Sequence, residues 1–247
     1  MRSPGYRIVV VSVVVVALIV GGVTIAVAGS GSTTAPITKA QAAAYAHTVN
    51  LRVSDLPGFK LALAGESEHG DAPSGPVPRP VEDCDGGPVV NGASRGVASP
   101  LFQKQSVPIQ TILSIVYPMR DPSIASAYIT AADGDRGLGC LHREEVLKRA
   151  ASGLREKSEV VALRPPLAGA PVSGVRVWLC LVRDPTCKNS ADRSFTDRLW
   201  FAAGPYVVTL FYIAPPENEA KGPEPLALPL ERHLVALLYN RAQAHKL

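Results

Sequence analysis

The chain has 247 residues, of which 47% are hydrophobic and 19% charged, with a formal net charge of +4. Its 25 basic and 21 acidic residues are interspersed without a basic block, which argues against binding to nucleic acid. No nucleotide-binding loop, dinucleotide-binding fingerprint or kinase motif occurs, so we expect no cofactor, no metal site and no catalytic residue.

The first feature along the chain is an uncharged apolar run from Ile8 to Ala28. As a helix rising ~1.5 Å per residue it spans about 30 Å, the hydrocarbon thickness of a bilayer, whereas a signal-peptide core has only about 7–15 residues. Arg2 and Arg7 precede the run, so the positive-inside rule places residues 1–7 in the cytoplasm and the rest outside. The run therefore predicts a transmembrane signal anchor, with the chain in the cell membrane as a single-pass protein.

A cleaved signal peptide is the alternative for the same segment. Ala26-Val27-Ala28 is an A-x-A triplet, and cleavage after Ala28 would release a secreted protein. In either case the bulk of the chain is exported. We expect residues 29–37 to form a flexible tether and residues 38–247 to form one extracytoplasmic α+β domain.

The N-terminal half of this domain alternates between helical and strand-like segments. Thr38 is the expected N-cap of an alanine-rich helix, which ends before a turn at Pro57-Gly58. Asp121 is the expected cap of a second helix that starts at Pro122 and closes at Gly134. The remaining predicted elements are strands over residues 60–64, 97–104 and 109–117 and a further helix over residues 136–151.

The C-terminal half predicts strands followed by a closing helix. The strands are expected over residues 159–163, 175–182, 194–202 and 206–214. The last segment, 229–247, has an apolar stripe formed by Leu230, Leu234, Leu237 and Leu238. Because consecutive strands are joined by short connections, we predict an α+β fold in which helices pack on one face of an antiparallel sheet.

The four cysteines all lie in the exported part, at Cys84, Cys140, Cys180 and Cys187. An even number of cysteines in an oxidising compartment predicts two disulfides, for which three pairings are open. The stretch CLVRDPTC contains an Asp-Pro turn signal, which favours Cys180–Cys187 and leaves Cys84–Cys140. A zinc site is the competing hypothesis, and the absence of a C-x-x-C pair argues against it.

Aromatic residues gather in the last three predicted strands. Packing in the core beneath the helices explains them. A second interpretation is that part of the set lines an apolar pocket, for which the candidates are Trp178, Trp200, Tyr206 and Tyr212.

One short motif points to catalysis. Residues 92–96 read GASRG and match the G-x-S-x-G pattern, which would make Ser94 the nucleophile of an envelope hydrolase. That chemistry needs a strand before the serine and a helix after it, whereas a turn-rich segment precedes Ser94 and a strand-like one follows. A different alternative is an accessory subunit of a membrane complex, because Gly22-x-x-x-Ala26 could support helix packing in the bilayer.

Three features together resemble a known family: HTVNLRVSDLPGF after the first helix, GCL around Cys140, and the closing amphipathic helix. In these features residues 38–245 are similar to extracytoplasmic sensor-type domains of actinobacteria, including PknH-like sensor domains and PsbP-like α+β envelope proteins. The resemblance implies a strongly bent antiparallel sheet around a cleft, and a role in binding a small ligand or an envelope protein. We therefore expect a membrane-anchored, non-catalytic binding or sensor-type module of the bacterial cell envelope.

Overall fold

The described residues contain helices at both ends, with strands and the helix α3 (Pro122–Asp133) between them. The computed structural model describes residues 36–62, 96–104, 110–133, 137–140, 142, 158–163, 167, 169–180, 193–214 and 229–245. The elements are α2 (Lys39–Val49), a 3-10 turn η1 (Val53–Asp55), β1 (Lys60–Leu61), β2 (Val97–Ala98), β3 (Phe102–Lys104), β4 (Gln110–Pro118), α3 (Pro122–Asp133), β5 (Ser158–Ala162), β6 (Ser173–Cys180), β7 (Arg193–Ala203), β8 (Tyr206–Ala214) and α5 (Pro229–Ala244).

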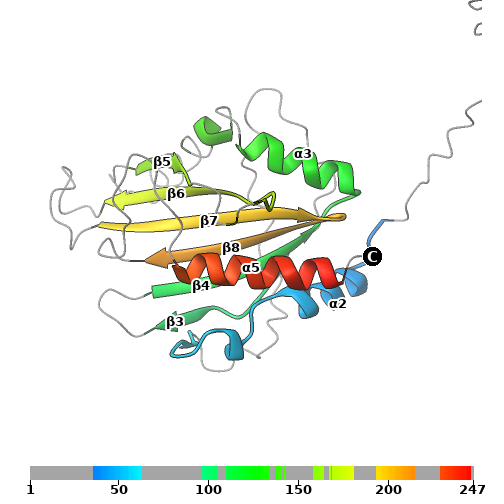
Figure 1. Ribbon diagram of the computed structural model, residues 1–247, viewed down its shortest axis with the longest axis horizontal. Coiled ribbons are helices and arrows are strands. Elements are labelled where there is room, and N and C mark those ends of the chain that lie inside the picture. The colour runs from blue at the N-terminus through cyan, green and yellow to red at the C-terminus, as the bar shows by residue number, and fades with distance from the viewer. Residues whose placement is uncertain are drawn as a thin grey trace, which may run out of the picture. The chain divides into compact units, whose positions relative to one another are not determined.

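The strands form one antiparallel sheet, as the sequence predicted. In the described part of the chain it has eight strands in the order β1-β3-β4-β8-β7-β6-β5, with β2 also paired to β4 (Figure 1). The long strands β7 and β8 form the centre and are joined by a two-residue connection, because Ala203 pairs with Tyr206. Gly204 in this connection has φ 57°, a left-handed conformation that glycine adopts without steric cost.

The strand predicted over residues 97–104 is divided by a bulge. Ala98 pairs with Ile115, and Phe102 pairs with Ile112. The three residues 99–101 therefore lie opposite only two residues of β4, 113 and 114. One of the three is Pro100, which has no N–H to donate to a sheet ladder. The bulge therefore separates β2 from β3 while both stay alongside β4.

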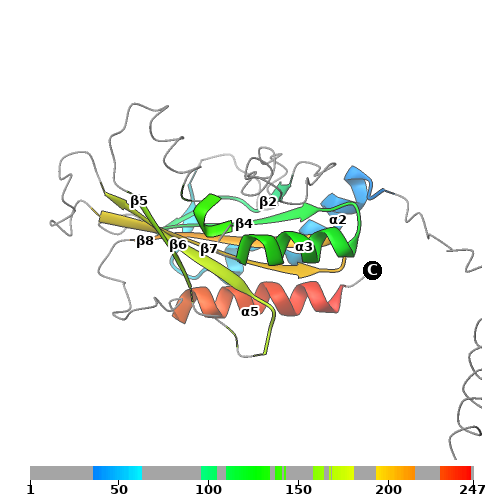
Figure 2. The same cartoon turned by 90° about the horizontal axis from the view of Figure 1, so that it is seen from above.

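Helices cover both faces of the sheet, which corrects the prediction of helices on one face only. On the first, the α5 face, α2 and α5 join one core cluster with side chains such as Phe201 and Val208. On the opposite face, the α3 face, α3 packs against Trp200 and Val207. In Figure 2, α3 and α5 flank the strands. The physical reason is that residues 199–203, LWFAA, are apolar at every position, so both faces of β7 require cover.

The predicted helix caps are confirmed. The Thr38 hydroxyl accepts a hydrogen bond from the Gln41 N–H (3.2 Å), and the Gln41 side chain accepts one from the Thr38 N–H (2.9 Å). The Asp121 carboxylate accepts from the N–H groups of Ser123 (2.9 Å) and Ile124 (3.0 Å). The hydroxyl of Ser123 and then the N–H of Ile124 lower the pKa of Asp121. Both caps satisfy N–H groups that a helix start would otherwise leave unpaired.

The closing helix also packs as its apolar stripe predicted. Leu234 and Leu238 are completely buried, whereas Leu230 and Leu237 are partly buried against the same core. Tyr45 of α2 stacks on Tyr206 with ring centroids 3.8 Å apart, which anchors α2 to the end of β8. The residues from Pro36 onward form one compact unit.

Other sequence predictions fall on segments that the structure does not describe. Among the described residues, no helix is both long and apolar enough to cross a bilayer. The apolar run 8–28 precedes the described ranges, and the predicted helix over 136–151 is described only at residues 137–140 and 142.

Candidate functional site

The four aromatic residues proposed to line one pocket do not converge. Trp178, Tyr206 and Tyr212 belong to the α5 face, but Trp200 lies in the core cluster of the α3 face. Its neighbours Leu199 and Phe201 point the other way because successive side chains alternate across a strand. Trp200 therefore lies apart from the other three, and an apolar pocket lined by part of this set stays a prediction.

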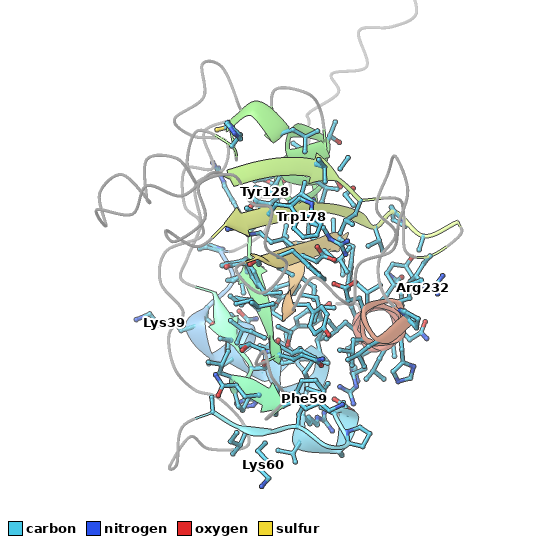
Figure 3. All side chains as sticks on the ribbon, turned by 90° about the vertical axis from the view of Figure 1, so that its left-hand side faces the viewer. Lys39, Phe59, Lys60, Tyr128, Trp178 and Arg232 are labelled. Carbon is cyan, nitrogen blue, oxygen red and sulfur yellow. The ribbon has the colours of Figure 1, made fainter. Side chains whose placement is uncertain are left out.

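Even on the α5 face, the remaining three aromatic residues are separated. Tyr206 and Tyr212 stand six residues apart on β8, which corresponds to about 20 Å along an extended strand. Tyr212 and Trp178 lie at the same end of the sheet, where each makes an edge-on contact with Phe195. The ring centroids are 5.4 Å apart for Trp178–Phe195 and 6.4 Å for Phe195–Tyr212. Figure 3 looks onto this end of the sheet and labels Trp178.

A row of polar side chains crosses the sheet beside these rings. The strand register places Arg176 of β6 opposite Asp197 of β7, and Asp197 opposite Tyr212 of β8. Arg176 Nε donates to Asp197 Oδ1 (2.7 Å) and Nη2 donates to Oδ2 (2.5 Å). Both side chains are 0% exposed. A two-point pair of this kind fixes the orientation of both groups, and losing either partner would leave a buried charge unpaired.

Aromatic rings surround the guanidinium of Arg176. Its central carbon lies 4.0 Å from the ring centroid of Phe195 and 5.7 Å from that of Trp178. Phe195 is completely buried, whereas Trp178 is only partly buried. The ring faces attract the cation and at the same time exclude water from it.

The first turn of α5 contributes a further acidic group. Glu231 is 0% exposed. Burial first, and then the charges of Glu231 and Asp197, raise the pKa of Tyr212 to about 12. The Tyr212 hydroxyl is therefore neutral at physiological pH. We refer to Arg176, Asp197, Tyr212 and Glu231 as the Arg176 cluster.

One donor of the Arg176 cluster is unused within the described part of the protein. Arg176 Nη1 is buried and has no hydrogen-bond partner there. An arginine side chain carries five N–H donors, and those on Nη1 are left for an acceptor. A buried N–H group without an acceptor costs free energy.

Sequence reasoning did not select Arg176 or Asp197. Arg176 lies between two valines in GVRVWL, whereas Asp197 lies between Thr196 and Arg198 in FTDRLW, and a charged residue in either setting is usually read as facing solvent. The only signal was at Arg176, whose flanking residues Val175 and Val177 are apolar, as is the next residue, Trp178, which is typical of a strand buried on both faces.

A second polar group links α5 to the beginning of the domain. Arg241 donates to Asp55 Oδ2 (2.7 Å) and Oδ1 (2.8 Å), and to the carbonyl of Asn50 (3.1 Å). The Asn50 amide donates to the Val97 carbonyl (3.0 Å), and its Oδ1 accepts from the Ser114 hydroxyl (3.0 Å). We call the pair Arg241 and Asp55 the α5 latch. Its groups are engaged with one another, so its role is structural.

The remaining sequence candidates divide between described and undescribed residues. Cys140 is 3% exposed and disulfide-bonded, while Cys84 and Cys187 lie outside the described residues, so the pairing stays a prediction. Ser94 also lies outside them, and the described residues that follow it form β2 rather than the helix a nucleophile elbow needs. Within the described ranges, no three His, Cys, Asp or Glu side chains gather where they could share a metal ion.

No protein-family model, curated protein or solved structure matches this chain. Its site is therefore interpreted from its own geometry and chemistry.

Proposed function

We propose that this chain is a membrane-anchored extracytoplasmic binding or sensor-type module of the bacterial cell envelope, without catalytic activity. The observation that carries the proposal is the buried disulfide bond of Cys140 in a domain that follows an apolar run of membrane-spanning length. Structural disulfides form and persist in oxidising compartments. The apolar run at residues 8–28 provides the route to such a compartment and the means of staying attached to its membrane.

The Arg176 cluster supports binding rather than catalysis. Nucleophilic catalysis needs a serine, cysteine or similar group beside a base, and the cluster contains no such pair. Asp197 is already engaged by Arg176 at two points, and Tyr212 keeps its proton at physiological pH. The resemblance to actinobacterial sensor-type domains agrees with this role.

A reporter experiment tests the compartment. The full chain is fused at its C-terminus either to alkaline phosphatase, which is active only outside the cytoplasm, or to green fluorescent protein, which fluoresces only inside. We expect phosphatase activity without fluorescence. A control that lacks residues 8–28 should give the reverse pattern. Fluorescence from the full-length fusion would contradict the proposal.

Mass spectrometry of the membrane-extracted chain then tests anchoring and binding. A retained anchor gives the mass of the whole chain, whereas cleavage after Ala28 gives a chain that begins at Gly29. Two disulfides lower the unreduced mass by about four hydrogens, two for each S–S bond. Under native conditions we expect a non-covalent adduct. A bare chain that also cross-links to no envelope protein would contradict a binding role.

A further inference from the structure

We infer that the turn formed by residues 52–60 docks on a membrane surface that carries anionic lipids. The turn reads RVSDLPGFK and runs from the end of α2, through η1, to the start of β1. The inference rests on the proposed membrane anchoring and names a second surface of the protein that contacts the lipid. It is carried by which side chains of the 52–60 turn face solvent and which do not.

The charged side chains of the 52–60 turn are sorted by sign. Arg52 and Lys60, at its two ends, are both exposed. The side chain of its acidic residue, Asp55, is only 8% exposed. The Asp55 carboxylate accepts two hydrogen bonds from Arg241 (2.7 and 2.8 Å) and one from the Arg52 N–H (2.8 Å). The turn therefore presents its positive charges to solvent, while its negative charge is neutralised by α5.

Apolar side chains are exposed between the two cations. Val53 is 37% exposed, and among the described residues only one other large hydrophobic side chain, Ile213 at 39%, is as exposed. Pro57 is exposed and Phe59 is partly buried. Figure 3 labels Phe59 and Lys60 at the lower edge of the view. Binding at a lipid interface grows with the apolar area that is buried and with the attraction between basic residues and anionic lipids, and the 52–60 turn offers both.

A bilayer is a partner within reach of this turn. Seven residues, 29–35, lie between the predicted span 8–28 and the first described residue, Pro36. Seven residues extend at most about 25 Å, and the 11 residues of α2 add about 16 Å between Pro36 and the turn. The 52–60 turn can therefore reach the bilayer in which the chain is proposed to be anchored. Because the chain is tethered there, the turn meets lipid at a high effective concentration.

Hydrogen exchange of the full chain in lipid vesicles tests the inference. One set of vesicles contains phosphatidylglycerol, which is anionic, and the other contains only phosphatidylcholine, which is neutral overall. Each basic residue near an anionic surface favours binding about fivefold, so two favour it about 30-fold. We expect exchange at residues 52–60 to be about tenfold slower in the anionic vesicles, and the difference to disappear in about 1 M salt. Equal exchange in the two sets would overturn the inference.

Paired variants locate the protection. Val53→Ser with Lys60→Glu removes one exposed apolar side chain and reverses one exposed charge within the turn. Ile213→Ser with Arg232→Glu makes the same two changes outside it and serves as the matched control. We expect both double variants to stay folded by circular dichroism, the first to lose the lipid-dependent protection and the control to keep it. Protection that survives in the first variant, or is lost equally in both, would contradict the assignment.

The outcomes separate this inference from the anchoring on which it rests. If alkaline carbonate washes the chain from the vesicles, the anchoring is wrong and the inference falls with it. If the chain resists the wash but residues 52–60 exchange alike in both lipids, the chain is anchored and only the docking of this turn is wrong.

Discussion

The two faces of the sheet are built from the same strands but bury different chemistry. Asp197 and Arg198 are consecutive residues of β7, yet Asp197 is completely buried beside Arg176 on the α5 face. Arg198 is partly exposed on the α3 face, where its guanidinium carbon lies 5.6 Å from the Phe211 ring centroid. Apolar packing therefore holds helices on both faces, whereas the fully enclosed ion pair of Arg176 and Asp197 lies on the α5 face. This difference separates the face that encloses a complete ion pair from the face where the neighbouring arginine stays partly exposed.

The comparison is tested most strongly by Asp197→Ala. The variant leaves the Arg176 charge buried without its partner, and we expect the free energy of unfolding to fall by about 3–5 kcal/mol. Arg198→Ala, one residue away on the other face, should cost much less because its side chain is partly exposed. Urea denaturation of the full chain in detergent, followed by circular dichroism, measures both. Equal losses would show that the two faces do not differ in this way.

The next largest effect is expected from truncating the helices. Leu234 of α5 is 0% exposed, so Leu234→Ala should lower the free energy of unfolding by about 2–5 kcal/mol through lost burial and a new cavity. Ile129→Ala on α3 removes a partly buried side chain and should cost less. The same denaturation experiment compares them, and a larger loss at Ile129 would reverse our ranking of the two helices.

Breaking the α5 latch should have a smaller effect. Asp55→Ala removes two charged hydrogen bonds to Arg241, and we expect a loss of about 1.5–3 kcal/mol. Asp55→Asn keeps one oxygen acceptor and should lose less than the alanine variant. Hydrogen exchange at the C-terminal turns of α5 should increase in both variants. Unchanged exchange would mean that apolar packing alone fixes this end of the helix.

The helix caps should respond alike on the two faces. Thr38→Ala on α2 and Asp121→Ala on α3 each remove a side-chain acceptor for helix N–H groups, and each should cost about 1 kcal/mol. Thr38 is exposed and Asp121 is partly exposed, and both caps are local, so the face of the sheet that each helix covers should not change the cost. Thermal unfolding of the two variants checks this, and a difference of several kcal/mol would show that one cap also supports tertiary packing.

The smallest effect at neutral pH concerns Tyr212. Its pKa is raised to about 12 in the folded protein, against roughly 10 for an unfolded tyrosine. The unfolded chain therefore loses the proton first, so the stability from Tyr212 is fully present below pH ~10 and falls as the pH rises toward 12. Tyr212→Phe should unfold with a shallower alkaline decline, measured as denaturation midpoints at pH 9 and 11. An unchanged decline would assign it to the other buried tyrosines, Tyr45, Tyr117 and Tyr206, whose pKa values burial also raises.

Local features of this fold were predictable from the sequence because their causes are local. The capping box at Thr38 needs only a partner three residues away, and the cap at Asp121 needs N–H groups two and three residues away. The bounds of β8 and the buried stripe of α5 follow from apolar patterning within one segment. The continuous run LWFAA also contained the information that β7 is buried on both faces, although the one-face interpretation overlooked it.

Only the tertiary structure decided which side chains meet. Whether Trp200 faces α5 or α3 depends on the pairing register of β7, and a shift of one residue would reverse it. Arg176 and Asp197 are separated by 21 residues and by the connection between two strands, and each alone reads as a polar residue facing water. Arg176 and Asp197 are buried together because each stands directly opposite the other on neighbouring strands. That condition is set by strand pairing, so the sequence determines the segments and the fold determines the site.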